Sequence, residues 1–134
     1  MFLLDTVMIS ELRKTDRNPG VIEWISDKQD SELFLSALTI GEIRRGICLQ
    51  AQKDPQFASR LSEWLDSVLH LYGERILPIS TSVAMEWGSI SAQTGNASAD
   101  NLIAATAKAH HLTVVSRNMK HFSSTGVPCI NPWS

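Results

Sequence analysis

LFLSALTIGEIRRGI, residues 33–47, is the stretch that decides the fold class. Residues 33–38 form a short apolar run, which is typical of a buried strand. From Thr39 onward the pattern becomes helical, with Ile43 and Ile47 one turn apart on the same face. An apolar run that leads directly into an amphipathic helix predicts one strand–helix unit of an α/β protein.

The same alternation continues outward to both ends of the chain. Further apolar runs of strand length lie at residues 2–4, 76–79, 112–115 and 127–130. Further helical patterns lie at residues 6–14, 21–25, 61–69, 83–90 and 102–109. Strands that alternate with helices predict a parallel sheet with helices on both faces. Binding sites in such proteins form beyond the carboxyl ends of the strands.

Length and composition restrict the possible classes of protein. A chain of 134 residues has the size of one domain, so we expect a single domain over residues 1–134. With 43% hydrophobic and 19% charged residues, a disordered or fibrous chain is excluded. The 12 Lys and Arg against 14 Asp and Glu give a formal charge of −2. This balance excludes a protein that holds nucleic acid by bulk positive charge alone.

Cysteine usage and the first residues predict a cytoplasmic protein. Cys48 and Cys129 are far apart and belong to no zinc-binding or redox spacing, which favours a reducing compartment. A carboxylate already appears at Asp5, too early for a signal peptide. No stretch approaches the roughly 20 apolar residues of a membrane span.

Three acidic residues occupy the positions where a site of such a sheet would form. Asp5 follows the first predicted strand, Glu42 opens the helix after the second, and Asp100 opens the helix before residues 112–115. Each has a purely structural alternative. Thr39 and Glu42 match a capping box, Asp5 has the right position for a helix N-cap, and Asp100 favours the positive end of a helix dipole.

Capping does not explain why three acids share one edge of one predicted sheet. Carboxylates brought together repel each other unless a cation neutralises them, and Mg²⁺ and Mn²⁺ prefer such oxygen ligands. An ion held in this way can promote hydrolysis of a phosphodiester. The sequence contains no glycine-rich phosphate loop and no nucleophile elbow that would favour a different chemistry.

Four motifs in order resemble those of PIN-domain toxins of the VapC type. They read LLDT at 3–6 with ISELR at 9–13, LSALTIGEIRRG at 35–46, DNLIAATA at 100–107 and LTVVSRN at 112–118. The ending NPW, at 131–133, is similar to the FitB-like branch of the family. The resemblance therefore covers the whole chain.

This resemblance implies an α/β/α sandwich and the toxin of a type II toxin–antitoxin system. Such a toxin is a ribonuclease that uses Mg²⁺ or Mn²⁺, cleaves RNA, often tRNA or rRNA, and inhibits translation. It is silenced by a VapB-type antitoxin and forms a homodimer. The resemblance assigns Asp5, Glu42 and Asp100 as catalytic metal ligands and Thr6 as a supporting hydroxyl.

Two departures from the family pattern concern the metal site. Val7 stands where the family usually has Asn, and neither Asn118 nor His121 supplies the fourth acid. Asn118 is then a neutral support that holds a metal-bound water, with only one ion bound firmly. Arg117 is the best candidate among the nearby cations for a substrate phosphate.

Two other functions remain open at this point. One is a catalytically weak or silent PIN-fold protein that acts through partner binding. The other is a PIN-like nuclease of RNA processing.

Overall fold

The computed structural model describes residues 1–134 as an α/β structure with seven α-helices and five strands. The strands are β1 (Phe2–Leu4), β2 (Leu33–Ser36), β3 (Ile76–Leu77), β4 (Thr113–Val115) and β5 (Cys129–Ile130). The helices are α1 (Thr6–Arg13), α2 (Pro19–Ser26), α3 (Ala37–Ala51), α4 (Pro55–Tyr72), α5 (Thr81–Thr94), α6 (Asp100–His110) and α7 (Met119–Thr125). Two short 3-10 helices, η1 (Asp30–Glu32) and η2 (Gly73–Arg75), precede β2 and β3.

The five strands form one parallel sheet in the order β3-β2-β1-β4-β5. From β1 the chain builds outward through β2 to β3, and it then returns to the other side of β1 to add β4 and β5. The direction of winding therefore reverses between β1 and β4. Ligands of open α/β sheets bind at such a reversal, beyond the carboxyl ends of the strands.

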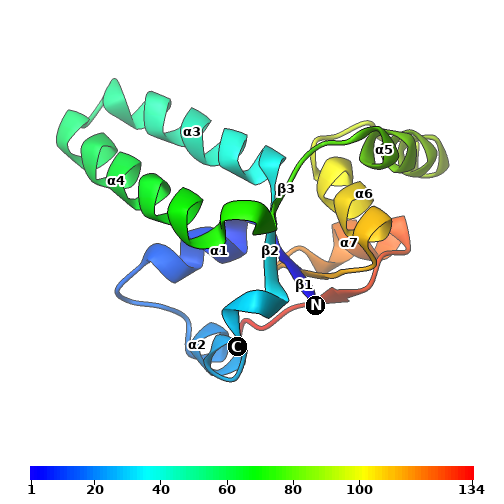
Figure 1. The fold of residues 1–134 in the computed structure, drawn as a ribbon, viewed down its shortest axis with the longest axis horizontal. Helices are drawn as coiled ribbons and strands as arrows, with labels where there is room; N and C mark the ends of the chain where they lie inside the picture. The colour runs from blue at the N-terminus through cyan, green and yellow to red at the C-terminus, as the bar shows by residue number, and fades with distance from the viewer.

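Helices cover both faces of the sheet, as the sequence predicted (Figure 1). One core includes Leu4 of β1 and buried residues of α1 to α4, and the other includes Leu3 and buried residues of α5 to α7. Leu3 and Leu4 are both fully buried because successive side chains of a strand point to opposite faces. The sheet is thus the middle layer of an α/β/α sandwich.

The start of α3 differs from the prediction. The strand ends at Ser36 and the helix begins at Ala37, so the expected strand end at residue 38 and helix start at Thr39 are wrong. Ser36 is the N-cap, and its hydroxyl accepts a hydrogen bond from the Leu38 N–H at 3.1 Å. Ala and Leu favour helix, and Ser is a preferred cap, so the helix starts at the earlier position. The capping box of Thr39 and Glu42 is therefore wrong.

Other differences lie in the second half of the chain. Helix α7 was not predicted; it begins after the N-cap Asn118 and ends at Gly126, whose φ is 77°. Strands β3 and β5 have 2 residues each and are shorter than the predicted runs. Pro78 follows β3 directly, and a proline cannot donate to the sheet.

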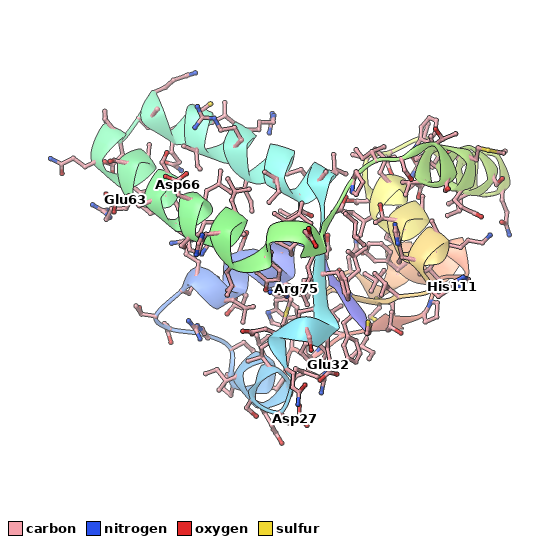
Figure 2. The ribbon with its side chains drawn as sticks, viewed as in Figure 1. Asp27, Glu32, Glu63, Asp66, Arg75 and His111 are labelled. Carbon is pink, nitrogen blue, oxygen red and sulfur yellow. The ribbon has the colours of Figure 1, made fainter.

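Arg75 fixes the connection between α4 and the sheet (Figure 2). Its guanidinium donates to the carbonyls of Leu71 at 2.9 Å and Leu33 at 2.6 Å, and also to that of Asp30. The end of α4 is thereby held beside the beginning of β2. None of the helices has the length and hydropathy needed to cross a bilayer.

Candidate active site

Asp5 lies at the reversal point of the sheet, between β1 and β4. Its backbone N–H donates to the Val115 carbonyl of β4 at 3.0 Å. Its side chain, in a residue only 7% exposed, accepts from the Thr6 N–H at 2.8 Å through Oδ1 and from the Ser116 hydroxyl at 2.7 Å through Oδ2. Asp5 is therefore the N-cap of α1, as the structural alternative proposed. Each carboxylate oxygen can still accept a further contact.

The surroundings of Asp5 disfavour its charge. Burial raises its pKa above the ordinary value of 3.8, and the negative charges of Asp100 and Glu42 raise it further. Hydrogen bonds from Ser116 and the Thr6 backbone act in the opposite direction, but the net shift is upward. The fold thus brings both Asp100 and Glu42 within electrostatic reach of Asp5.

Glu42 is half-buried in the second turn of α3 and is held by α1. The Thr6 hydroxyl lies 2.7 Å from Glu42 Oε1 and 3.0 Å from the hydroxyl of Thr39. Because an ionised carboxylate only accepts, the Thr6 proton points to Glu42, and the fully buried Thr39 supplies the proton of the second bond. This chain of hydroxyls fixes the orientation of Glu42.

Asp100 is the first residue of α6 and is half-buried at the positive end of that helix. The next residue, Asn101, is fully buried. Its side-chain amide donates to the Asn96 carbonyl and to the Thr94 hydroxyl, the latter at 3.4 Å. These bonds tie the loop before α6 to the end of α5 and so determine where Asp100 lies.

Sequence reasoning missed Ser116, Thr39 and Asn101 as parts of this site. All three are polar residues with 0% exposure. Ser116 and Asn101 stand inside quoted motifs, directly after a strand and directly after an acid, and those positions are the only local signal. What each side chain contacts depends on segments distant in the chain.

The chemistry of the donor set fits a hard divalent cation. Asp5, Glu42 and Asp100 offer only oxygen atoms, and Mg²⁺ usually takes one or two carboxylates while it keeps several waters. No three His, Cys, Asp or Glu side chains lie close enough to enclose an ion by themselves. The fit is therefore to a partly hydrated ion, not to a closed cage of side chains.

The two departures from the family pattern lie on the surface. Val7 is 49% exposed in the first turn of α1. Asn118 is exposed, and its side-chain oxygen accepts from the His121 N–H at 3.4 Å as the cap of α7. Its backbone N–H donates to the Ser116 hydroxyl at 2.9 Å. Asn118 is thus one hydrogen bond away from the group that holds Asp5.

Neither Arg117 nor His121 shares a pocket with the three acids. The guanidinium of Arg117 lies 5.9 Å from the centre of the Trp133 ring, in a pocket that none of Asp5, Glu42 and Asp100 lines. His121 packs edge-on against Phe122, and its Nε2 is buried with no hydrogen-bond partner.

A groove of about 290 Å³ opens beside Glu42, between α1, α3 and α4. Its polar lining comprises Thr6, Ser10, Arg13, Glu42 and Gln50, together with Gly46. Its apolar lining comprises Ile43, Ile47, Phe57, Leu61 and Trp64. The groove therefore joins a carboxylate of the site to an apolar surface.

Comparison with known proteins agrees with this geometry. The family model described as PIN domain matches residues 2–127. The chain is 36% identical over 140 residues to Toxin FitB of Neisseria gonorrhoeae, with 99% of each sequence covered. It is 34% identical to VapC ribonuclease Y4jK of Sinorhizobium fredii, with 99% of this chain and 98% of that protein covered. The crystal structure of FitAcB from Neisseria gonorrhoeae superposes with a TM-score of 0.90, 37% identity and 99% coverage of both chains.

Proposed function

Because the chain belongs to the PIN-domain family, we propose that it is the toxin of a type II toxin–antitoxin pair and acts as a metal-dependent endoribonuclease in the cytoplasm. The relatives named as a toxin and as a VapC ribonuclease support this function. The observation that carries it is the buried Asp5 carboxylate at the reversal point of the sheet, on which the negative charges of Glu42 and Asp100 both act.

We assign Asp5 and Asp100 as direct ligands of the ion, and Glu42 as a ligand or as the group that orients the attacking water. Asp5 is held from two sides by Ser116 and by the Thr6 N–H, so its oxygens have little freedom to turn. Glu42 is oriented through Thr6, and its carboxylate can accept a proton from water at the second oxygen.

The ion is Mg²⁺ or Mn²⁺, the cations that suit an all-oxygen site. When bound, it neutralises the clustered carboxylates and stabilises negative charge on the phosphate under attack. The side chains then provide positioning, because Asp5, Thr6 and Ser116 are already connected by hydrogen bonds within the fold.

The proposed partner is a VapB-type antitoxin that binds the groove beside Glu42. A guanidinium pairs well with carboxylates, and an amphipathic helix can place its apolar face against Phe57, Leu61 and Trp64. A solved toxin–antitoxin complex from Klebsiella pneumoniae with the same fold supports a protein partner. Family resemblance also implies a homodimer, which the mass in solution would test.

Cleavage of RNA by the purified protein tests the function directly. We expect cleavage of tRNA or rRNA with Mn²⁺ or Mg²⁺, none with EDTA, and cut ends that map to defined positions. Asp100→Asn should abolish most of the activity, whereas Asp66→Asn on α4 provides a matched change on the outer surface (Figure 2). Cleavage that survives both EDTA and Asp100→Asn would overturn the proposal.

The alternative of a silent PIN-fold protein is favoured by one observation, namely that Val7 offers no polar support and neither Asn118 nor His121 supplies a fourth acid. Expression in bacteria separates these functions. A toxin arrests growth, Asp5→Ala abolishes the arrest, and a gene directly upstream neutralises it. A nuclease of RNA processing would cleave RNA but would need no neutralising neighbour.

A further inference from the structure

A second pocket, of about 310 Å³, lies on the other side of α1 from the groove. Three segments distant in the chain form it: the end of α1 with the loop to α2, the residue after Ser116, and the last residues of the chain. Its charged lining comprises Glu11, Lys14, Asp16, Arg17 and Arg117. Cations thus outnumber acids in this pocket, although the whole chain carries −2.

The buried acid of this pocket is already satisfied. Glu11, which is 8% exposed, accepts from the Asn18 N–H at 2.8 Å and from Lys14 Nζ at 3.0 Å. These two contacts hold its pKa below the ordinary value. Glu11 is therefore already paired with Lys14 and with the loop backbone. The guanidinium groups of the pocket remain available to other partners.

The charge of Arg117 helps to lower the pKa of Glu11, but no carboxylate pairs directly with either guanidinium group. Neither Arg17 nor Arg117 forms an ion pair. Arg17 is oriented by a single bond, from its Nε to the Lys14 carbonyl at 2.9 Å, which leaves its two terminal amino groups available. Asp16, the remaining acid, is exposed and also forms no ion pair.

The pocket is held in shape by the tail, residues 131–134. The ring of Trp133 lies beneath the guanidinium of Arg117, and the Trp133 N–H donates to the Asn131 side chain at 3.0 Å. The Ser134 N–H donates to the Asn18 side chain at 3.0 Å, which fixes the tail to the start of α2. Trp133 also packs against the core on that face of the sheet.

The pocket is connected to the acidic site through the chain, at the step from Ser116 to Arg117. Arg117 directly follows Ser116, the residue that holds Asp5. A site with three carboxylates repels an RNA strand, so cations close to it must bind the phosphates on either side of the cleaved bond. We propose, on the basis of the proposed ribonuclease function, that Arg117 and Arg17 bind a phosphate of single-stranded RNA outside the scissile bond, with Trp133 as the support of Arg117.

The test measures RNA binding without cleavage. The binding of a fluorescent single-stranded RNA to full-length protein is titrated in EDTA over a series of salt concentrations. Arg117→Gln and Arg17→Gln should each weaken binding by roughly fivefold, the upper range for an exposed ion pair. Each should also reduce the slope of log Kd against log salt by about 0.7, the value for one phosphate contact on a single strand.

Matched variants identify the source of any effect. Lys53→Gln, which removes the same charge at the exposed turn between α3 and α4, should leave both affinity and slope unchanged. Trp133→Leu should weaken binding as Arg117→Gln does, and Trp133→Phe should restore part of it. Thermal unfolding of each variant separates loss of the pocket from loss of the fold.

The possible outcomes separate this inference from the proposed function. If the wild type binds RNA and both arginine variants bind with the same affinity and slope, the inference is wrong and the ribonuclease function stands. If the wild type binds no RNA in EDTA, the inference is wrong, and cleavage with Mn²⁺ decides the ribonuclease function separately. If the arginine variants bind RNA normally but lose affinity for an acidic antitoxin segment, the pocket binds protein and the inference is again overturned.

Discussion

The Thr6 hydroxyl donates to Glu42 Oε1 at 2.7 Å and so connects the first residue of α1 to the second turn of α3. Thr6→Val replaces this hydroxyl with a methyl group of nearly the same volume and leaves Glu42 without its donor. We expect RNA cleavage to fall by about tenfold to a hundredfold, the usual effect of removing a support of a metal ligand.

A conservative variant separates orientation from packing at Thr6. Thr6→Ser keeps the hydroxyl and should retain most of the activity in steady-state cleavage assays. The Tm of both variants should stay close to that of the wild type, because Thr6 is only half-buried. Equal activity of Thr6→Val and the wild type would show that Glu42 needs no support from α1.

Asp5→Asn and Asp100→Asn remove charge with almost no change in shape. Each should lower the cleavage rate at least tenfold, which corresponds to about 1.4 kcal/mol of transition-state stabilisation. The Asp5→Asn side chain can still accept from the Thr6 N–H, so we expect the cap of α1 and the fold to survive. Full activity of the double variant would end the assignment of these ligands.

Stability without metal should depend on pH through Asp5. Because burial and like charges raise its pKa above 3.8, the folded state holds this proton more tightly than the unfolded state. The contribution of Asp5 to stability is therefore present at low pH and is lost as pH rises from about 4 through the folded-state pKa.

The measurement is the Tm of wild type and Asp5→Asn in EDTA from pH 4 to pH 8. We expect the Tm of Asp5→Asn to rise relative to that of the wild type as the pH increases. This difference in Tm should then reach a plateau. Addition of Mn²⁺ should close this difference by stabilising the wild type alone. A difference in Tm that is constant over the whole pH range would contradict the raised pKa of Asp5.

Inhibition should depend on a cation supplied by the antitoxin. An arginine inserted among Asp5, Glu42 and Asp100 would neutralise them and occupy the place of the ion. We therefore expect Mg²⁺ and the antitoxin to compete, with weaker inhibition at high Mg²⁺. An antitoxin variant with Ala for that arginine should bind the groove but inhibit poorly. A co-crystal with the antitoxin far from the acids would contradict this mode.

Asn118→Asp tests whether the site is one charge short. Divalent cations gain affinity with charged oxygen ligands, so this variant should lower the Mn²⁺ concentration needed for half-maximal cleavage. Asp caps a helix as well as Asn does, so α7 should remain intact. Val7→Asn should independently lower this Mn²⁺ concentration, by adding a polar group near Asp5. If Asn118→Asp leaves the metal titration unchanged, Asn118 is simply the cap of α7.

All elements of the fold except α7 and the two short 3-10 helices were predictable, because their signals are local. Residues 33–47 contain both the apolar run and the helical spacing. Within them only the boundary at Ser36 was misplaced, since Ala37 and Leu38 continue the apolar run. The strand order was not predictable in the same way. The position of β4 beside β1 depends on pairing between segments more than a hundred residues apart, which no local pattern encodes.

Within the site, too, local signals were predictable and contacts between distant segments were not. Asp5, Glu42 and Asp100 were proposed because each follows or precedes a predicted strand at one edge of the sheet, although Glu42 lies in the second turn of α3 and does not open it. The contact between Ser116 and Asp5 spans 111 residues, and the role of Thr6 depends on how α1 meets α3. Such supporting contacts arise only once the helices are packed.

The attachment of the tail to Asn18 also determines how this part of the molecule opens. The Asn18 side chain accepts from the N–H groups of Gly20 at 3.0 Å and Ser134 at 3.0 Å. A methyl group at Gly20 would collide with the Pro132 carbonyl, so the two segments are in direct contact. Release of the tail therefore exposes the first amides of α2 at the same moment, and these amides should exchange hydrogen with solvent as one cooperative unit.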